Sequence, residues 1–195
     1  MEVEAERWRR TERERLIAAR MALAIECRAA QTLIITQQLD PLIPAAGGTI
    51  VSVYWPIRAE PDLRHWMRTA CEGGMRIALP VAVALRQPLK FREWRPGAPL
   101  AHGLWNIPYP AEGADVTPTV LLVPLVGFDT ECYRLGYGGG FFDRTLAAID
   151  TPRLAIGVGY SVASIPTIHP QPHDIPMDWI VTGASAPLKR AALQT

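Results

Sequence analysis

Cysteine is scarce in this sequence, and the few cysteines are not arranged for pairing. Cys27, Cys71 and Cys132 lie far apart, are odd in number, and form no C-x-x-C pair. This pattern indicates neither a disulfide framework nor a zinc site. A reduced setting fits such a chain best, and we expect the protein to be cytoplasmic.

The sequence also lacks an excess of either charge and a long apolar run. Lysine and arginine number 20 against 19 acidic residues, so the net charge of +1 favours neither nucleic acid nor an anionic membrane as a partner. Residues 1–20 are densely charged, which excludes a secretory signal. The longest apolar stretch, residues 119–127, is too short for a membrane span and indicates a buried strand.

The patterning predicts a single α/β domain over residues 1–195. Good helix formers without glycine or proline fill residues 4–39 within an N-terminal helical region, 1–40, and leave room for a break near its middle. Strands and helices then alternate, which predicts a three-layer α/β/α fold with a mixed, mostly parallel sheet. The expected strands are 49–55, 76–83, 120–126, 153–160 and 179–182, and the expected helices are 61–71 and 141–149.

Residues 84–118 interrupt this alternation. The segment holds much of the proline of the chain, together with Trp94 and Trp105. Large aromatic side chains need a surface to pack on, so the segment is not a free linker. We expect an irregular or hairpin-bearing excursion here.

The stretch RLGYGGGFFDR, residues 134–144, carries the strongest chemical signal. It follows a predicted buried strand and opens a predicted helix, where α/β sheets bind ligands, and its glycine N–H groups and helix start suit an anion. Arg134 and Arg144 could bind phosphate, and Asp143 is a plausible Mg²⁺ ligand. The spacing matches neither a Walker A loop nor G-x-G-x-x-G. The flanking strand and helix exclude a linker, but the spacing alone leaves a plain turn and a phosphate cradle equally open.

Four ordered segments resemble the 5-formyltetrahydrofolate cyclo-ligase (methenyltetrahydrofolate synthetase) family. They are VYWPIRAE at 53–60, GLWNIPYP at 103–110, VPLVGFD at 123–129 followed by the glycine stretch, and HDIPMD at 173–178. The resemblance spans nearly the whole chain. It implies an ATP- and Mg²⁺-dependent ligase that closes the ring of 5-formyltetrahydrofolate to give 5,10-methenyltetrahydrofolate, ADP and phosphate.

The resemblance also implies roles for single residues. Glu60 would hydrogen-bond the pterin, and Trp105 would stack on or wall the folate. Asp143 and Asp178 would be the metal ligands, and Arg10 would reach the ATP phosphates from the first helix. No residue is implied as a nucleophile or base. The ATP loop would comprise Arg134, Leu135, Gly136, Tyr137, Gly138, Gly139, Gly140, Phe141, Phe142 and Arg144, with Tyr137 and Phe141 also facing the folate.

Four positions depart from the family pattern, namely Phe141, Gly139, Glu14 and Cys132. The first two stand where some members have Tyr and Lys. Glu14 stands where some members are basic, and Arg9 or Arg13 could substitute for that charge. Cys132 replaces a turn glycine, which questions whether φ is positive there.

Two other functions stay open. One is a non-catalytic folate- or RNA-binding protein that keeps the fold, against which intact Arg134, Asp143, Glu60 and Trp105 argue. The other is a transferase or isomerase with a related α/β fold, acting on CoA esters or phosphosugars, but no loop for a catalytic CoA-transferase glutamate can be located. We expect a monomer whose partners are ATP and 5-formyltetrahydrofolate.

Overall fold

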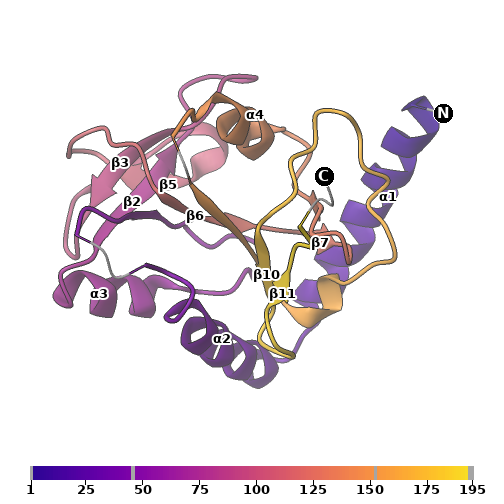
Figure 1. Ribbon diagram of the computed structural model, residues 1–195, viewed down its shortest axis with the longest axis horizontal. Coiled ribbons are helices and arrows are strands. Elements are labelled where there is room, and N and C mark those ends of the chain that lie inside the picture. The colour runs from indigo at the N-terminus through magenta and orange to yellow at the C-terminus, as the bar shows by residue number, and fades with distance from the viewer. Residues whose placement is uncertain (1, 45–46, 152, 193–195) are drawn as a thin grey trace.

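Short apolar strands assemble into a seven-stranded sheet with the order β11-β10-β9-β6-β1-β2-β3 (Figure 1). The five central strands are parallel, and β3 and β11 add antiparallel at the two edges. The predicted mixed, mostly parallel sheet is therefore confirmed. The strands are β1 (Ile50–Ser52), β2 (Arg76–Val81), β3 (Lys90–Trp94), β6 (Val120–Pro124), β9 (Leu154–Val158), β10 (Trp179–Val181) and β11 (Leu188–Lys189).

This computed structural model describes residues 2–44, 47–151 and 153–192. Residues 1, 45–46, 152 and 193–195 of the predicted domain lie outside the described residues. Within the described ranges, no helix is both long and apolar enough to cross a membrane.

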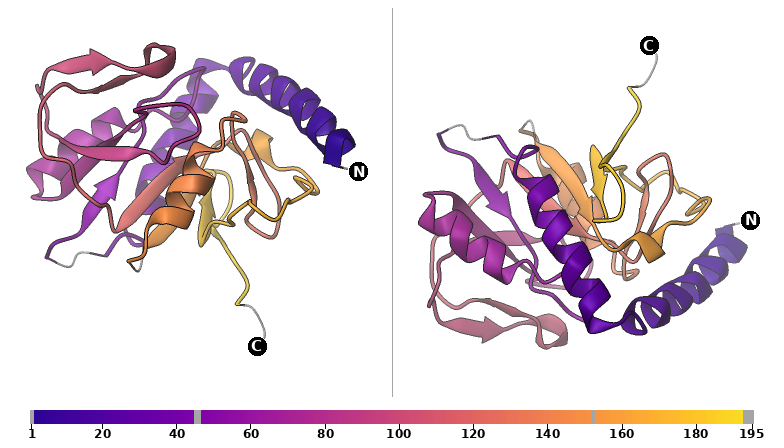
Figure 2. Two further views of the ribbon diagram at one scale, coloured as in Figure 1. Left: turned by 90° about the horizontal axis from the view of Figure 1, so that it is seen from above. Right: turned by 90° about the horizontal axis from the view of Figure 1, so that it is seen from below.

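Helices cover both faces of the sheet. Helices α2 (Ile25–Leu39) and α3 (Arg64–Glu72) lie on one face, and α4 (Phe141–Ala148) lies on the other (Figures 1 and 2). The residues of β6 alternate between the two layers: Leu122 joins the α2 and α3 side, whereas Leu121 packs in the same cluster as Leu146 of α4. Each of these leucines is at most 1% exposed, and burying one contributes roughly 1.5–3 kcal/mol to folding.

The predicted N-terminal helical region is two helices, α1 (Glu2–Met21) and α2, that bend at residues 22–24. Helix α1 lies beside the sheet and not on either face (Figure 2). Its Leu16 is buried against Val126, Leu135 and Ile165, next to the ribbon of β7 (Gly127–Phe128) and β8 (Arg134–Leu135). The ribbon therefore docks α1 next to the glycine stretch that follows β8.

The excursion at 84–118 contains a hairpin, as expected. Strand β3 joins the main sheet, and β4 (Leu100–His102) pairs with β5 (Pro108–Pro110). The turn between them is a short 3-10 segment, η1 (Leu104–Asn106), in which Trp105 and Asn106 have φ of 56° and 58°. Trp94 is buried in the core, whereas Trp105 is 63% exposed at the tip of the hairpin.

Observed strands are shorter than the predicted ones, mainly at their carboxyl ends. The segment predicted at 49–55 pairs only over β1, and that predicted at 153–160 only over β9. The apolar pattern continues because Val53 and Tyr160 are still buried after their chains leave the sheet. These exits form one edge of the sheet, where the loops of the candidate site begin.

Candidate active site

A cavity of about 550 Å³ opens beyond the carboxyl ends of β1, β2 and β6. This is the edge at which open α/β sheets bind ligands. All of the predicted site residues line it except Arg10, Arg144 and Asp178. The predicted residues that it brings together are Glu60, Trp105, Arg134, Leu135, Gly136, Tyr137, Gly138, Gly139, Gly140, Phe141, Phe142 and Asp143.

The glycine loop needs its glycines for conformation and space. Gly138 and Gly140 have φ of 90° and 62°, a region that costs most side chains energy. A Cβ at Gly139 would lie 2.9 Å from the ring of Phe141. The position where some family members carry Lys therefore has no room for a side chain unless Phe141 moves, which links two of the departures.

Arg144 supports the loop from outside the cavity. Its guanidinium donates a hydrogen bond to the carbonyl of Gly139 and lies 5.5 Å from the ring centroid of Phe141. The side chain therefore folds back on the loop. Its predicted contact with ATP phosphate stays a prediction, because one loop carbonyl occupies only Nη2 and Arg144 does not line the cavity.

A buried carboxylate forms the other end of the cavity. Glu60 is 5% exposed, and its two oxygens accept hydrogen bonds from the Tyr137 hydroxyl at 2.7 Å and the Ile57 amide at 2.9 Å. The Tyr137 oxygen in turn accepts a hydrogen bond from Arg20 at 2.5 Å. Arg20 and Arg58 both lie 5.8 Å from the centroid of the Tyr137 ring. The carboxylate is thus oriented by defined donors and stands among cations.

Burial sets the protonation behaviour of this end. Burial raises the pKa of Glu60, while its hydrogen bonds to Ile57 and Tyr137 and the charges of Arg20 and Arg58 oppose that rise. The pKa of Tyr137 is raised, first by burial and then by the neighbouring charge of Glu60. Tyr137 is therefore a neutral hydroxyl that donates to Glu60, which is the arrangement that its two hydrogen bonds require.

Arg134 and Asp143 form an ion pair at the phosphate end. The guanidinium of Arg134 donates to Oδ1 of Asp143 at 3.0 Å, and Oδ1 also accepts the Ile175 amide at 3.2 Å. Within the described part of the chain, this leaves Oδ2 of Asp143 as the oxygen that could reach a metal. Asp143 balances the charge of Arg134, so a phosphate at this end would need further cations from other segments.

The first helix supplies such cations, but not at the predicted residue. Arg10 points to solvent, with its side chain 81% exposed and paired with Glu14. Arg9 and Arg13 line the cavity instead. Arg13 Nε donates to the carbonyl of Gly136 at 2.9 Å, and Arg9 is buried against Asp174. The prediction for Arg10 is therefore corrected to its neighbours, because about 100° per residue turns Arg10 off the face that meets the loop.

Asp178 lies away from the cavity. It immediately precedes β10, and its Oδ2 accepts the Ala155 amide at 2.8 Å, near the start of β9. That is the amino end of these parallel strands, opposite the edge that carries the cavity. The predicted second metal ligand is thus a backbone-binding residue, and no group of three or more His, Cys, Asp or Glu that could hold a metal occurs among the described residues.

Phe141 and Cys132, which also depart from the family pattern, leave the local geometry intact. Phe141 packs edge to face on Trp105, with ring centroids 5.4 Å apart, so both walls of the predicted folate site touch. Cys132 has φ of 65° although it is not glycine, and it is buried. Asp129 accepts the Glu131 and Tyr133 amides around it, which stabilises this turn. The positive φ that was questioned at Cys132 is therefore present.

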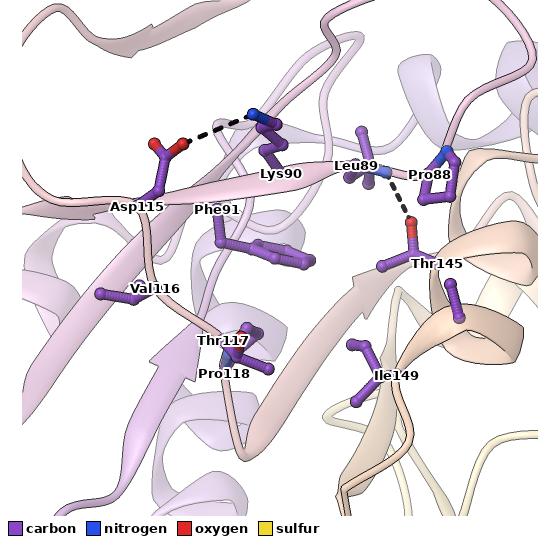
Figure 3. Close-up of a pocket in the computed structure, with 11 residues that line it drawn as sticks. Pro88, Leu89, Lys90, Phe91, Asp115, Val116, Thr117, Pro118, Thr145 and Ile149 are labelled. Carbon is purple, nitrogen blue, oxygen red and sulfur yellow. Dashed lines mark hydrogen bonds and ion pairs between the residues drawn. The ribbon is translucent and has the colours of Figure 1, made fainter.

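A second cavity, of about 410 Å³, lies between β3, residues 115–118 and α4 (Figure 3). Lys90 and Asp115 line it and lie 3.7 Å apart, so their charges compensate each other. Thr145 accepts the Leu89 amide at 2.8 Å across it (Figure 3). Its remaining wall is mostly apolar and holds none of the predicted site residues, so it does not compete as a phosphate site.

The sequence analysis assigned no site role to Arg58, His173 and Asp174, which line the main cavity, or to Arg20, which bonds the Tyr137 hydroxyl. Helical spacing contained a signal for α1. Arg9, Arg13, Leu16 and Arg20 recur at intervals of four, three and four and share one face. Three of them are at most 4% exposed, namely Arg9, Leu16 and Arg20. Arginines in register with a buried leucine indicate a face that meets protein, not water.

Known proteins share both the sequence pattern and this fold. A sequence profile of the 5-formyltetrahydrofolate cyclo-ligase family matches residues 5–183. The chain is 34% identical to 5-formyltetrahydrofolate cyclo-ligase of Mycolicibacterium smegmatis over 69% of this chain and 74% of that protein, and 30% identical to that of Escherichia coli K12 over 71% and 80%. The NMR structure of Aquifex aeolicus 5,10-methenyltetrahydrofolate synthetase superposes with a TM-score of 0.82 at 27% identity, over 96% and 95% of the two chains. The chain belongs to the 5-formyltetrahydrofolate cyclo-ligase family.

Proposed function

We propose that this protein catalyses the ATP-dependent cyclisation of 5-formyltetrahydrofolate to 5,10-methenyltetrahydrofolate, with release of ADP and phosphate. One observation carries the proposal: a single cavity joins a glycine loop and arginines to a buried carboxylate, Glu60, beside aromatic side chains. The first set suits a nucleotide phosphate and the second suits a pterin. The family to which the chain belongs supports the same reaction.

At the phosphate end, Arg13 is the cation that we assign to ATP. Its partner Glu6 is 67% exposed, so the pair is screened by water and readily exchanged for a phosphate. The guanidinium already lies on the loop, since it is 3.4 Å from where a Cβ of Gly138 would stand. Phosphate oxygens that meet the loop amides would therefore also meet Arg13.

At the folate end, Glu60 is the recognition group. A carboxylate accepts two parallel hydrogen bonds, which matches the adjacent N–H groups of a pterin ring. Burial makes this recognition selective, because a ligand without those donors would leave the remaining acceptor positions of a desolvated carboxylate unfilled. Trp105 and Phe141, already in edge-to-face contact, would wall the rest of the folate.

The reaction needs positioning more than a protein nucleophile. The formyl oxygen attacks the γ-phosphorus of ATP, an O–P bond forms, and ADP leaves. N10 of the folate then attacks the activated formyl carbon, its proton goes to solvent, and the C–O bond breaks to release phosphate. Tyr137 belongs to the glycine loop and bonds Glu60, so the two binding ends are joined directly and the formyl oxygen can be presented to the phosphate.

We assign Mg²⁺ to Asp143 alone. Mg²⁺ commonly binds through one or two carboxylates together with substrate phosphates, so a single protein carboxylate fits. Asp143 lines the cavity within the first turn of α4, and its Oδ2 is free to face inward among the described residues. When bound, the ion would neutralise charge on the β- and γ-phosphates.

The test is direct. The purified protein is mixed with 5-formyltetrahydrofolate, ATP and Mg²⁺, and the absorbance of methenyltetrahydrofolate is followed against a control without ATP. Product that depends on ATP supports the function. A folded protein that binds the folate but forms no product would favour the non-catalytic alternative.

The expectations of a monomer, of cytoplasmic location and of no nucleic-acid or membrane partner stay predictions.

A further inference from the structure

Arg20 is a buried cation that the reaction described above does not use. It is 4% exposed on α1, and its guanidinium reaches three separate segments. Nε donates to the carbonyl of Arg58 at 3.0 Å, Nη1 to the carbonyl of Leu125 at 3.3 Å, and Nη2 to the hydroxyl of Tyr137 at 2.5 Å. One side chain thus joins the loop after β1, the end of β6 and the glycine loop.

The loop after β1 requires such support. Arg58 and Ala59 have φ of 46° and 59°, although neither is glycine. A left-handed conformation is strained for a residue with a side chain, so the turn persists only where its surroundings hold it. The turn is closed by the Glu60 amide on the Ile57 carbonyl at 3.0 Å and by the Glu60 side chain on the Ile57 amide at 2.9 Å. This strained turn therefore fixes the orientation of Glu60.

We propose that Arg20 is a positioning residue of the folate end: its guanidinium clamps the turn at 58–60 and the Tyr137 hydroxyl together, so that Glu60 is presented to the substrate. This inference rests on the proposed function. Because Arg20 fills the acceptor site of the Tyr137 oxygen, the hydroxyl proton is directed to Glu60. The geometry assigns Arg20 to folate recognition and not to ATP, since two of its three acceptors, the Arg58 carbonyl and the Tyr137 hydroxyl, adjoin Glu60.

Arg20→Lys is the informative variant. Lysine keeps the positive charge but presents one nitrogen, which cannot reach three diverging acceptors as a guanidinium does. We expect the KM for 5-formyltetrahydrofolate to rise about tenfold or more, the size of losing one or two charge-assisted hydrogen bonds. The KM for ATP should stay within about twofold, well below that tenfold threshold. Arg15→Lys is the matched control, because Arg15 lies on the same helix, is exposed and pairs with Glu12.

Amide hydrogen exchange tests the clamp formed by Arg20 independently of catalysis. In Arg20→Lys, the amides of Ile57 and Glu60 should exchange faster, while those of β6 and β9 stay protected. Tyr137→Phe removes only the hydroxyl link and should speed the same two amides, so the clamp is testable even if the Arg20 variant does not fold. The two substitutions together should raise the folate KM by less than the product of their separate effects, as expected for groups in one network.

The outcomes separate the two proposals. A wild type that forms no methenyltetrahydrofolate defeats the proposed function, whereas the exchange data still report on the clamp. An active enzyme in which Arg20→Lys changes both KM values equally overturns the inference. Unchanged exchange at Ile57 and Glu60 in Tyr137→Phe also overturns it.

Discussion

Arg134 and Asp143 are nine residues apart and form a largely buried ion pair, with 3.0 Å between Nη1 and Oδ1 and with side-chain exposures of 3% and 14%. Arg134 is the first residue of β8, the second strand of the ribbon, and Asp143 lies in the first turn of α4. The pair therefore closes the base of the glycine loop. Asp143 carries two duties, one toward Arg134 and one, through its other oxygen, toward the proposed metal.

Asp143→Asn should separate those duties. The amide oxygen can still accept from Arg134 and Ile175, but the guanidinium loses its counter-charge. Removing one charge of a buried pair costs on the order of 3 kcal/mol, which chemical denaturation would measure as a lower free energy of unfolding. If Oδ2 binds the metal, the Mg²⁺ concentration for half-maximal activity should also rise about tenfold, the effect of losing one charged ligand. An unchanged Mg²⁺ response in active protein would contradict the metal role.

Asp178→Asn is the matched control for that experiment. Asp178 accepts the Ala155 amide and lies outside the cavity, so its loss should lower the free energy of unfolding by about 1 kcal/mol. The Mg²⁺ requirement of the variant should equal that of the wild type. A Mg²⁺ requirement raised as in Asp143→Asn would instead support the assignment that the family resemblance implied for Asp178.

Arg13→Ala should weaken ATP specifically. The variant loses a cation at the glycine loop and the bond from Nε to the carbonyl of Gly136. Charge-assisted hydrogen bonds contribute about 1.5–3 kcal/mol, which corresponds to a rise of roughly 10- to 150-fold in the KM for ATP. Arg10→Ala, three residues away on the same helix and with its side chain 81% exposed, should change that KM by less than about twofold. Steady-state rates at saturating folate would measure both, and the reverse ranking would restore Arg10 to the phosphate site.

Gly138→Ala and Gly136→Ala compare two glycines of the same loop. Gly138 has φ of 90°, so alanine there is strained by roughly 1–2 kcal/mol and should shift the loop. Gly136 has no such φ, and a Cβ would meet nothing within 4 Å. We expect the first variant to raise the KM for ATP and lower the melting temperature, and the second to resemble the wild type in both. Equal effects of the two substitutions would mean that the loop conformation does not set ATP affinity.

Much of the fold could be predicted because periodicity reports burial. Along β6, Val120 and Leu122 point to one buried face and Leu121 and Val123 to the other, and predicted helices both before and after this strand are available to cover them. Strand ends were less predictable, since Val53 is buried in a loop after β1 and looks the same in sequence as a strand residue. The ribbon of β7 and β8 was missed because each strand has only two residues.

Local sequence predicted Asp143 and the family resemblance predicted Glu60, but neither could predict the direction in which a side chain points. Glu60 and Asp143 sit next to a turn or loop that fixes them, and both line the cavity. Arg10 and Asp178 are of the right residue type in the right segment but lie away from the cavity. A step of one residue on a helix turns a side chain by about 100°, which takes Arg10 off the cavity face of α1. Asp178 lies at the amino ends of its strands, whereas the cavity lies at the carboxyl ends. Arg20 could be inferred only from its register with Leu16.

Glu60→Gln tests the burial of the carboxylate through the pH dependence of stability. Burial raises the pKa of Glu60 from its ordinary value of 4.5. Between these two pKa values the folded state holds more protons than the unfolded state, so stability falls as pH rises. Relative to Glu60→Gln, which does not titrate, the wild type should be most stable below about pH 4.5. It should then lose at most about 1.4 kcal/mol per pH unit until the folded pKa is passed. Denaturant unfolding of both proteins between about pH 4 and pH 8 covers this window.

The stability-against-pH curves of the wild type and Glu60→Gln also separate the effect of ionisation from that of lost hydrogen bonds. The substitution also disturbs the bonds from Tyr137 and Ile57, but those losses shift the stability curve by an amount that does not depend on pH, whereas ionisation changes its slope. Glu112→Gln, at an exposed glutamate, should run parallel to the wild type. If instead the wild type gains stability over Glu60→Gln as pH rises, then the hydrogen bonds and arginines outweigh burial. Glu60 would then be held as a carboxylate before any substrate binds.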